Sequence, residues 1–212
     1  MCGRFALHHP NDEIHEQFQV EHPEFLFEPR YNIAPTQTIA VVMADRRLVG
    51  MKWGLVPRWS KDNKPFINAR GETIAEKPSF RENFKSRRVI VPCSGFYEWQ
   101  ADGKRRLPFY IRMKDGRPFG LGAVYEPGEV PTVALVTTAA NAVLSPFHHR
   151  MPVILAPADY ARWLSPAETD AASLVRSFDA AAMEAFPVCT RVNGVKDDDA
   201  GLIAPERRGL FG

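Results

Sequence analysis

Cys2, the second residue of the chain, can carry out chemistry that an internal cysteine cannot. Removal of Met1 would leave Cys2 with an amine and a thiol on neighbouring carbons. The amine of such a 1,2-aminothiol condenses with an aldehyde, and the thiol then closes a five-membered thiazolidine ring. The unperturbed pKa values, about 7.7–8.0 for the amine and about 8.5 for the thiol, leave both groups close to their reactive forms at neutral pH. The alternative is that this cysteine has no chemical role. Taken alone, its position favours that alternative, because reactive thiols are the exception among cysteines.

Two short motifs place polar groups where chemistry is possible. Asn68 is a neutral amide that can both donate and accept, so it suits orienting a substrate hydroxyl or a backbone group, and nearby Arg70 suits a phosphate. A strand end with a solvated arginine is the simpler alternative. Glu98 lies among Phe96, Tyr97 and Trp99, so neither face of its strand is plainly solvent-facing. A carboxyl group in an apolar site has a raised pKa, as a general acid or base near pH 7 requires.

Two adjacent histidines, His148 and His149, precede a predicted strand. Because histidine titrates near neutral pH, the pair suits a proton shuttle. The pair has no aspartate, glutamate or cysteine at ligand spacing, so we predict neither a metal site nor a cofactor.

Arginines and tryptophans recur beside the predicted turns. The set comprises Arg4, Arg30, Arg58, Arg70 and Arg150, with Trp53 and Trp59 among their aromatic neighbours. Arginines for phosphates and flat rings for bases are typical of a groove that binds single-stranded nucleic acid. For any one of these residues, a solvated arginine or a core tryptophan is the alternative.

The bulk composition is that of an ordinary globular protein, and we expect one domain over residues 1–212. The net charge of +2 gives no basic coat, so contacts with nucleic acid must come from local clustering. The three cysteines are widely spaced, which is typical of a reducing cytosol. Without a signal-peptide or membrane-spanning stretch, we expect a cytoplasmic monomer that associates with the nucleoid when bound to DNA and has no membrane partner.

The elements that must position these residues are short and mostly extended. We expect strands over 39–43, 48–53, 88–93, 95–100, 107–113, 119–125, 132–138, 152–155 and 188–192. Asp102-Gly103 and Asp115-Gly116 predict hairpin turns. We expect helices from Asn11, which can cap the first of them, and over 72–76, 79–85, 157–164 and 166–177. The fold class is α+β, with a curled, largely antiparallel, open barrel-like sheet and short flanking helices.

Six motifs, taken in order, resemble one family, the SOS response-associated peptidase (SRAP) family, whose members process abasic sites in single-stranded DNA. They are Met1-Cys2-Gly3-Arg4-Phe5, Arg30-Tyr31-Asn32-Ile33-Ala34-Pro35-Thr36-Gln37, Trp53-Gly54-Leu55-Val56-Pro57, Asn68-Ala69-Arg70-Gly71-Glu72-Thr73, Pro92-Cys93-Ser94-Gly95-Phe96-Tyr97-Glu98-Trp99 and His148-His149-Arg150-Met151-Pro152. The stretches at 192–193 and 202–203 are similar to the family's C-terminal end. The resemblance therefore covers nearly the whole chain.

The resemblance implies that Cys2 forms a stable thiazolidine with the ring-opened aldehyde of an abasic site and so shields the strand. It implies Asn68, Glu98 and His148 as catalytic partners: Asn68 orients the sugar or the Cys2 backbone, and the other two move protons. The DNA contacts it implies are Arg4, Asn32, Trp53, Arg70, Trp99 and Arg150.

Family members are also thought to remove the residues before the cysteine by autoproteolysis. Here only Met1 precedes Cys2. A methionine aminopeptidase could remove it, because cysteine is small.

Two positions depart from the family's pattern. His149 stands where an acidic residue is usual, which affects the expected pH dependence, and Gly71 stands where serine or alanine is usual, with a smaller expected consequence. Two other functions remain open: a thiol peptidase that uses Cys2 on polypeptides, and a non-covalent binder of single-stranded DNA. No oxyanion-hole or peptide-groove motif favours the peptidase, and a simple binder would not need the catalytic set.

Overall fold

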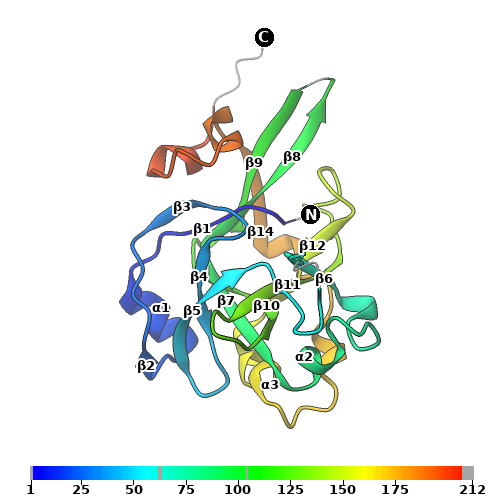
Figure 1. Ribbon diagram of the computed structural model, residues 1–212. Helices are drawn as coiled ribbons and strands as arrows, with labels where there is room; N and C mark the ends of the chain where they lie inside the picture. The colour runs from blue at the N-terminus through cyan, green and yellow to red at the C-terminus, as the bar shows by residue number, and fades with distance from the viewer. Residues whose placement is uncertain (1, 62–63, 104, 207–212) are drawn as a thin grey trace.

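The computed structural model describes residues 2–61, 64–103 and 105–206 (Figure 1). Met1, whose removal we expect, lies outside the described residues. The strands are β1 (Phe5–Leu7), β2 (His22–Pro23), β3 (Arg30–Ile33), β4 (Thr38–Val42), β5 (Arg47–Trp53), β6 (Asn68–Arg70), β7 (Arg88–Cys93), β8 (Gly95–Asp102), β9 (Arg105–Met113), β10 (Phe119–Glu126), β11 (Thr132–Ala139), β12 (Arg150–Pro152), β13 (Ile154–Leu155) and β14 (Met183–Pro187).

The helices are short. The α-helices are α1 (Asn11–Phe18), α2 (Arg81–Ser86) and α3 (Tyr160–Leu164). The 3-10 turns are η1 (Gly71–Thr73), η2 (Pro157–Asp159), η3 (Ala171–Leu174), η4 (Ala180–Ala182), η5 (Thr190–Asn193) and η6 (Ala200–Ile203). Within the described ranges, no helix has the length and apolar character needed to cross a membrane.

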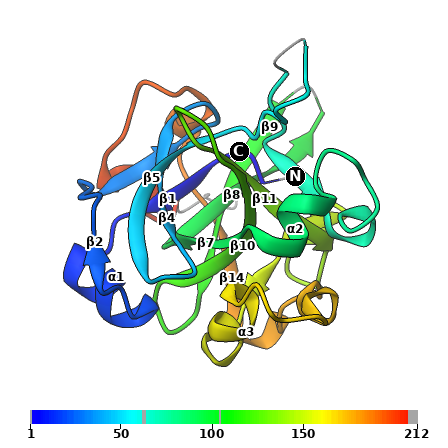
Figure 2. The same ribbon diagram turned by 60° about the horizontal axis from the view of Figure 1, so that its bottom comes forward.

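The strands of the described residues form two sheets (Figure 1 and Figure 2). One has the order β14-β9-β8-β1-β3 and the other the order β12-β11-β10-β7-β4-β5-β2. Most neighbours are antiparallel; β11 pairs in parallel with β5 and β6, and β2 with β5. The predicted α+β class with a largely antiparallel sheet and short helices is confirmed.

The structure corrects four local predictions. The turn at Asp115-Gly116 is present, with Gly116 at φ 75°, but it connects strands of different sheets and is no hairpin. The last strand is β14, whereas most of the stretch 188–192 lies in η5: Thr190 is exposed between the buried Val188 and Val192, so burial there does not alternate as in a strand. The helix expected over 166–177 shortens to η3. The Asn11 side chain caps no helix and instead donates a hydrogen bond to the Phe27 carbonyl.

Strand β1 lies between two apolar cores. Phe5 and Leu7 belong to the larger core, whereas Ala6 belongs to a smaller one with Tyr97 and Tyr110. Figure 1 shows the hairpin of β8 and β9 projecting from the body, with the C-terminal 3-10 turns beside its base. Successive side chains of a strand point to opposite faces, so both faces of β1 are buried. The strand is therefore fixed in the fold, and so is the direction of the segment that precedes it.

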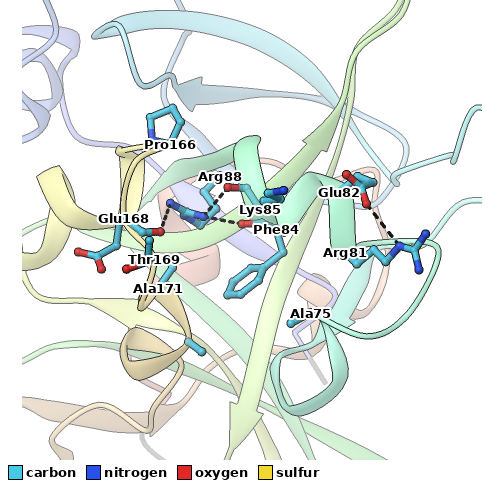
Figure 3. A pocket seen from close by; sticks show the side chains of 11 residues that line it. Ala75, Arg81, Glu82, Phe84, Lys85, Arg88, Pro166, Glu168, Thr169 and Ala171 are labelled. Carbon is cyan, nitrogen blue, oxygen red and sulfur yellow. Dashed lines mark hydrogen bonds and ion pairs between the residues drawn. The ribbon is translucent and has the colours of Figure 1, made fainter.

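Arg88 is a buried cation that joins three segments (Figure 3). It is 4% exposed, and its Nη1 donates to the carbonyls of Phe84 (2.6 Å) and Lys85 (3.0 Å) in α2. Its Nε donates to the Trp163 carbonyl in α3 at 2.8 Å, and Nη2 donates to the Ser165 carbonyl. Burial lowers the pKa of Arg88, and the carbonyl oxygens around it accept hydrogen bonds from its guanidinium. The residue holds α2 and α3 together beneath a hollow of about 450 Å³.

Replacing Arg88 by methionine should destabilise the fold by about 3 kcal/mol, because several buried carbonyls lose their donor. Urea unfolding followed by circular dichroism measures this change. Arg81→Met, a substitution in α2 at a side chain that is 58% exposed, should change stability by less than about 0.5 kcal/mol. Equal effects of the two substitutions would contradict the assignment.

Candidate active site

Strands β1 and β8 bring Cys2 next to Glu98. The backbone N–H of Tyr97 donates to the Arg4 carbonyl at 3.0 Å, which continues the β1–β8 pairing toward the N-terminal end. The chain before Arg4 therefore runs along β8 past Glu98. Cys2 is fully buried and Glu98 is 4% exposed.

Burial dominates the electrostatics of this pair. Burial, with the charge of Glu98 as a second cause, raises the pKa of the Cys2 thiol to about 12. Burial also raises the pKa of Glu98. The thiolate and the carboxylate therefore disfavour each other, so loss of the thiol proton is coupled to the protonation state of Glu98.

Asn68 fixes the Cys2 backbone from the second sheet. Its Nδ2 donates to the Cys2 carbonyl at 2.9 Å, and β6 is aligned by pairing with β11. The Oδ1 of Asn68 is buried and accepts no hydrogen bond from the described residues. The amide therefore holds the cysteine with one end and presents a free acceptor with the other.

The loop that carries His148 packs against the strand pair of Glu98. The ring of Phe147 lies 4.6 Å from that of Phe109, measured between centroids. Phe109 in β9 is registered directly opposite Glu98 in β8. His148 is therefore held at the edge of the same region, partly exposed.

The protonation of His148 follows from its hydrogen bond. Its Nδ1 lies 2.9 Å from the backbone N of Arg150, which donates to it, so a neutral ring carries its proton on Nε2. Burial lowers the pKa of His148, and the charges of His149 and Arg150 add to the effect. The ring of His149 stacks on that of His148 at 4.4 Å between centroids. His148 thus presents a neutral Nε2–H donor.

A hollow of about 490 Å³ opens beside the Cys2 segment. The hollow is lined by Gly3, Arg4, Trp99, Arg106 and Asn193. The Arg4 guanidinium carbon lies 5.9 Å from the centroid of the Trp99 ring, and the Trp99 Nε1 donates to the Asn193 Oδ1 at 2.7 Å. Arg106 and Asn193 were not predicted; pairing of β8 with β9 brings Arg106 here, and η5 brings Asn193.

Two predicted DNA contacts are buried and cannot touch DNA in this structure. Asn32 is 1% exposed; it accepts a 2.6 Å hydrogen bond from Arg4 and donates to the Gly194 carbonyl, so it holds Arg4 in place. Trp53 is 0% exposed and donates its Nε1 proton to the Ile67 carbonyl, next to Asn68. For both residues, the prediction of a direct contact is corrected to a supporting position.

The other predicted contacts differ in exposure. Arg70 is exposed at the end of β6. The side chain of Arg150 is 13% exposed and is bound to Glu72 and to the Thr137 carbonyl. Among residues 2–61, 64–103 and 105–206, no group of three histidine, cysteine, aspartate or glutamate side chains could hold a metal.

Gly71, expected to be a minor departure, is required by close packing. A Cβ at this position would lie 2.1 Å from Cγ1 of Val175 and 3.1 Å from the Thr137 carbonyl oxygen. Because valine is stiff at χ1, it cannot easily move aside. The absence of a side chain at Gly71, the first residue of η1, therefore leaves the space that the Val175 side chain occupies.

Gly71→Ala should destabilise the protein by about 1–3 kcal/mol, the usual cost of overpacking. The double substitution Gly71→Ala with Val175→Ala should recover part of that loss, because it removes the clashing methyl group. Thermal unfolding of the two single variants and the double variant measures the coupling. Additive losses would show that the contact with Val175 does not set the cost.

Comparison with known proteins adds a family and a function to this geometry. The family model described as SOS response associated peptidase (SRAP) matches residues 1–195. The chain is 40% identical to the abasic site processing protein YoqW of Bacillus subtilis, covering 96% of this chain and 99% of the relative. It is 31% identical to the abasic site processing protein YedK of Escherichia coli, covering 97% and 100%. A crystal structure of a protein from Bacteroides thetaiotaomicron superposes with a TM-score of 0.87 at 25% identity, covering 97% of this chain and 100% of that one.

Proposed function

This chain belongs to the SOS response-associated peptidase (SRAP) family, and from that premise we propose that it binds abasic single-stranded DNA and crosslinks to it through Cys2. The observation that carries the proposal is the hydrogen bond from Asn68 to the Cys2 carbonyl, beside the buried Glu98. These groups come from both sheets and meet at the one residue that could become an N-terminal aminothiol.

The proposed reaction has two bond-forming steps after Met1 is removed. The Cys2 amine adds to the aldehyde carbon of the ring-opened abasic site, and loss of one water gives an imine. The Cys2 sulfur then adds to the imine carbon, forming the C–S bond, while the thiol proton is passed to the imine nitrogen. The product is a thiazolidine, and no oxidant or reductant is consumed.

In this scheme Glu98 transfers a proton, whereas His148 donates a hydrogen bond. The Glu98 carboxylate takes the thiol proton and returns it to the nitrogen, a role favoured by its raised pKa. His148, with its proton on Nε2, donates a hydrogen bond to a sugar oxygen of the opened ring. The free Oδ1 of Asn68 accepts from the amine or a sugar hydroxyl.

Binding of the strand is assigned to the cations and the ring that line the hollow, together with one exposed cation outside it. Arg4 and Arg106 supply positive charge and Trp99 supplies a ring in the hollow. Arg70 is exposed at the end of β6 and adds a further positive charge. Because these contacts neutralise phosphates, affinity should fall as salt rises.

Trp59 adds a second ring, in the loop that joins β5 to β6 and so leads to Asn68. It is 62% exposed. Trp59→Ala should raise the Kd for single-stranded DNA at least about fivefold, because one stacked base contributes about 1–3 kcal/mol. Fluorescence anisotropy with a labelled oligonucleotide measures the change. Leu26→Ala, which alters an apolar side chain on a residue 73% exposed, is the matched control and should leave Kd unchanged. Equal Kd values for Trp59→Ala and the wild type would remove Trp59 from the binding surface.

One experiment tests the function directly. The purified protein is incubated with an oligonucleotide bearing a single abasic site and analysed by denaturing gel and intact mass. We expect a heat-resistant adduct whose mass equals protein plus oligonucleotide minus one water. A peptidase acting on polypeptides and a non-covalent binder both predict no adduct, so its absence from protein with a free Cys2 amine would reject the proposal.

Exposure of the Cys2 amine is part of the same proposal. We assign the removal of Met1 to an ordinary methionine aminopeptidase or to the protein itself. Intact mass of a variant carrying a short extension before Cys2 distinguishes the two, because only self-cleavage removes an extension that the aminopeptidase does not accept.

A further inference from the structure

A two-point ion pair links the segment after Asn68 to the strand after His148. Arg150 Nη2 donates to Glu72 Oε2 at 2.7 Å, and Arg150 Nη1 donates to Glu72 Oε1 at 2.5 Å. The same Nη2 lies 2.6 Å from the Thr137 carbonyl oxygen. The Arg150 guanidinium is therefore held between η1 and β11.

The ion pair connects η1, which directly follows β6, with β12. Among the described residues, β6 and β12 do not pair with each other. Both β6 and β12 pair with β11, with Arg70 opposite Thr137 and Arg150 opposite Ala139. In the ladder of the described residues, β6 and β12 are joined through β11, which pairs with both of them. Glu72 closes this arrangement with a direct connection.

We propose that Glu72 is a positioning residue, which fixes Arg150 so that the Arg150 backbone N–H keeps His148 in its Nε2–H tautomer. The geometry is a chain of two contacts: Glu72 binds the Arg150 side chain, and the Arg150 N–H donates to His148 Nδ1 at 2.9 Å. The proposal rests on the proposed function, because it assigns Glu72 to the same site.

Burial separates this pair from an ordinary surface ion pair. Exposed pairs contribute little, since solvent screens them and two long side chains must be ordered. Here the Arg150 side chain is 13% exposed, although Glu72 is 49% exposed. The bidentate geometry orders both groups, and the hydrogen bond from Arg150 lowers the pKa of Glu72. The predicted phosphate contact of Arg150 would have to displace Glu72, so Arg150 is better placed to hold His148 than to bind the strand.

Two measurements on Glu72→Ala test the proposal. The first is the rate of adduct formation with an abasic single-stranded oligonucleotide, which we expect to fall about three- to tenfold. The second is the nitrogen-15 NMR spectrum of the His148 ring, which should change from one Nε2–H tautomer to a mixture of both. A merely structural role of Glu72 would not alter the tautomer.

The controls keep the result interpretable. Glu76→Ala removes an exposed glutamate a few residues along the chain and should change neither readout. Glu72→Gln keeps an acceptor for Arg150 and should give intermediate values. In a His148→Ala background, Glu72→Ala should cause no further loss of rate, since its effect passes through His148.

Two outcomes would overturn the proposal: an unchanged His148 spectrum in Glu72→Ala, or a rate loss that persists fully without His148. Failure of the proposed function has a different signature, since wild-type protein would then form no adduct. The NMR readout still tests the positioning role in that case.

Discussion

Replacing Cys2 by alanine is expected to abolish the heat-resistant adduct with abasic DNA completely. Alanine at position 2 still permits removal of Met1, so the amine remains and only the sulfur is lost. An imine can then form, but no ring can close, and the imine hydrolyses during denaturation. Denaturing gels of reactions run with and without borohydride measure this, because the reagent reduces the imine to a stable amine. We expect a Cys2→Ala adduct only in its presence.

The complementary variant keeps the sulfur and blocks the amine. A non-cleavable extension before Cys2 should give no heat-resistant adduct without borohydride, because the Cys2 nitrogen is then an amide and cannot form the imine that the thiol closes on. Together the two variants separate the roles of the nitrogen and the sulfur. A heat-resistant adduct from Cys2→Ala without borohydride would place the covalent bond on another residue and reject the thiazolidine.

Local turn and strand chemistry made much of the fold predictable. The strand over 88–93 has the predicted bounds, and the Asp102-Gly103 turn joins two paired strands, with Gly103 at φ 57°. What failed depended on tertiary context. Asp115-Gly116 has the same turn chemistry, yet the chain crosses to another sheet there. A turn signal reports the local backbone and carries no information about which strand will pair next.

The site shows the same division. Residue types identified Cys2, Asn68 and Glu98 as candidates, and the hydrogen bond from Asn68 to Cys2 is consistent with that choice. Their assigned roles stay predictions. Exposure could not be read from the sequence: Trp53 was a candidate DNA contact, with a core tryptophan as the alternative, and it is fully buried. Arg106 lies in no motif, and the motif that holds Asn193 gave it no role. Only the pairing of β9 and the path of η5 bring these two residues beside Arg4.

Replacing Glu98 by glutamine should slow adduct formation about 10²-fold, the usual contribution of a positioned acid or base. The reason is that glutamine cannot accept the thiol proton, although it keeps the size of the side chain. Burial raises the pKa of Glu98, so its basic form is lost at a higher pH than that of an ordinary glutamate. The wild-type rate should therefore fall as the pH drops through that raised pKa, in addition to the loss caused by protonation of the amine. In Glu98→Gln only the amine's dependence remains. Single-turnover rates between about pH 5 and pH 8.5 should show the advantage of the wild type shrinking as the pH falls.

The substitution Glu98→Gln should slow crosslinking but speed up a different reaction, the alkylation of Cys2. The charge of Glu98 raises the pKa of the Cys2 thiol, so its removal should lower that pKa and make the thiolate easier to form. Alkylation of Cys2 by a small reagent should therefore be faster in Glu98→Gln than in the wild type, while crosslinking is slower. A purely electrostatic role for Glu98 would change both rates in the same direction, because a more available thiolate would also add faster to the imine. Opposite changes require that the carboxylate moves the proton during ring closure, whereas parallel changes would remove the catalytic role assigned to Glu98.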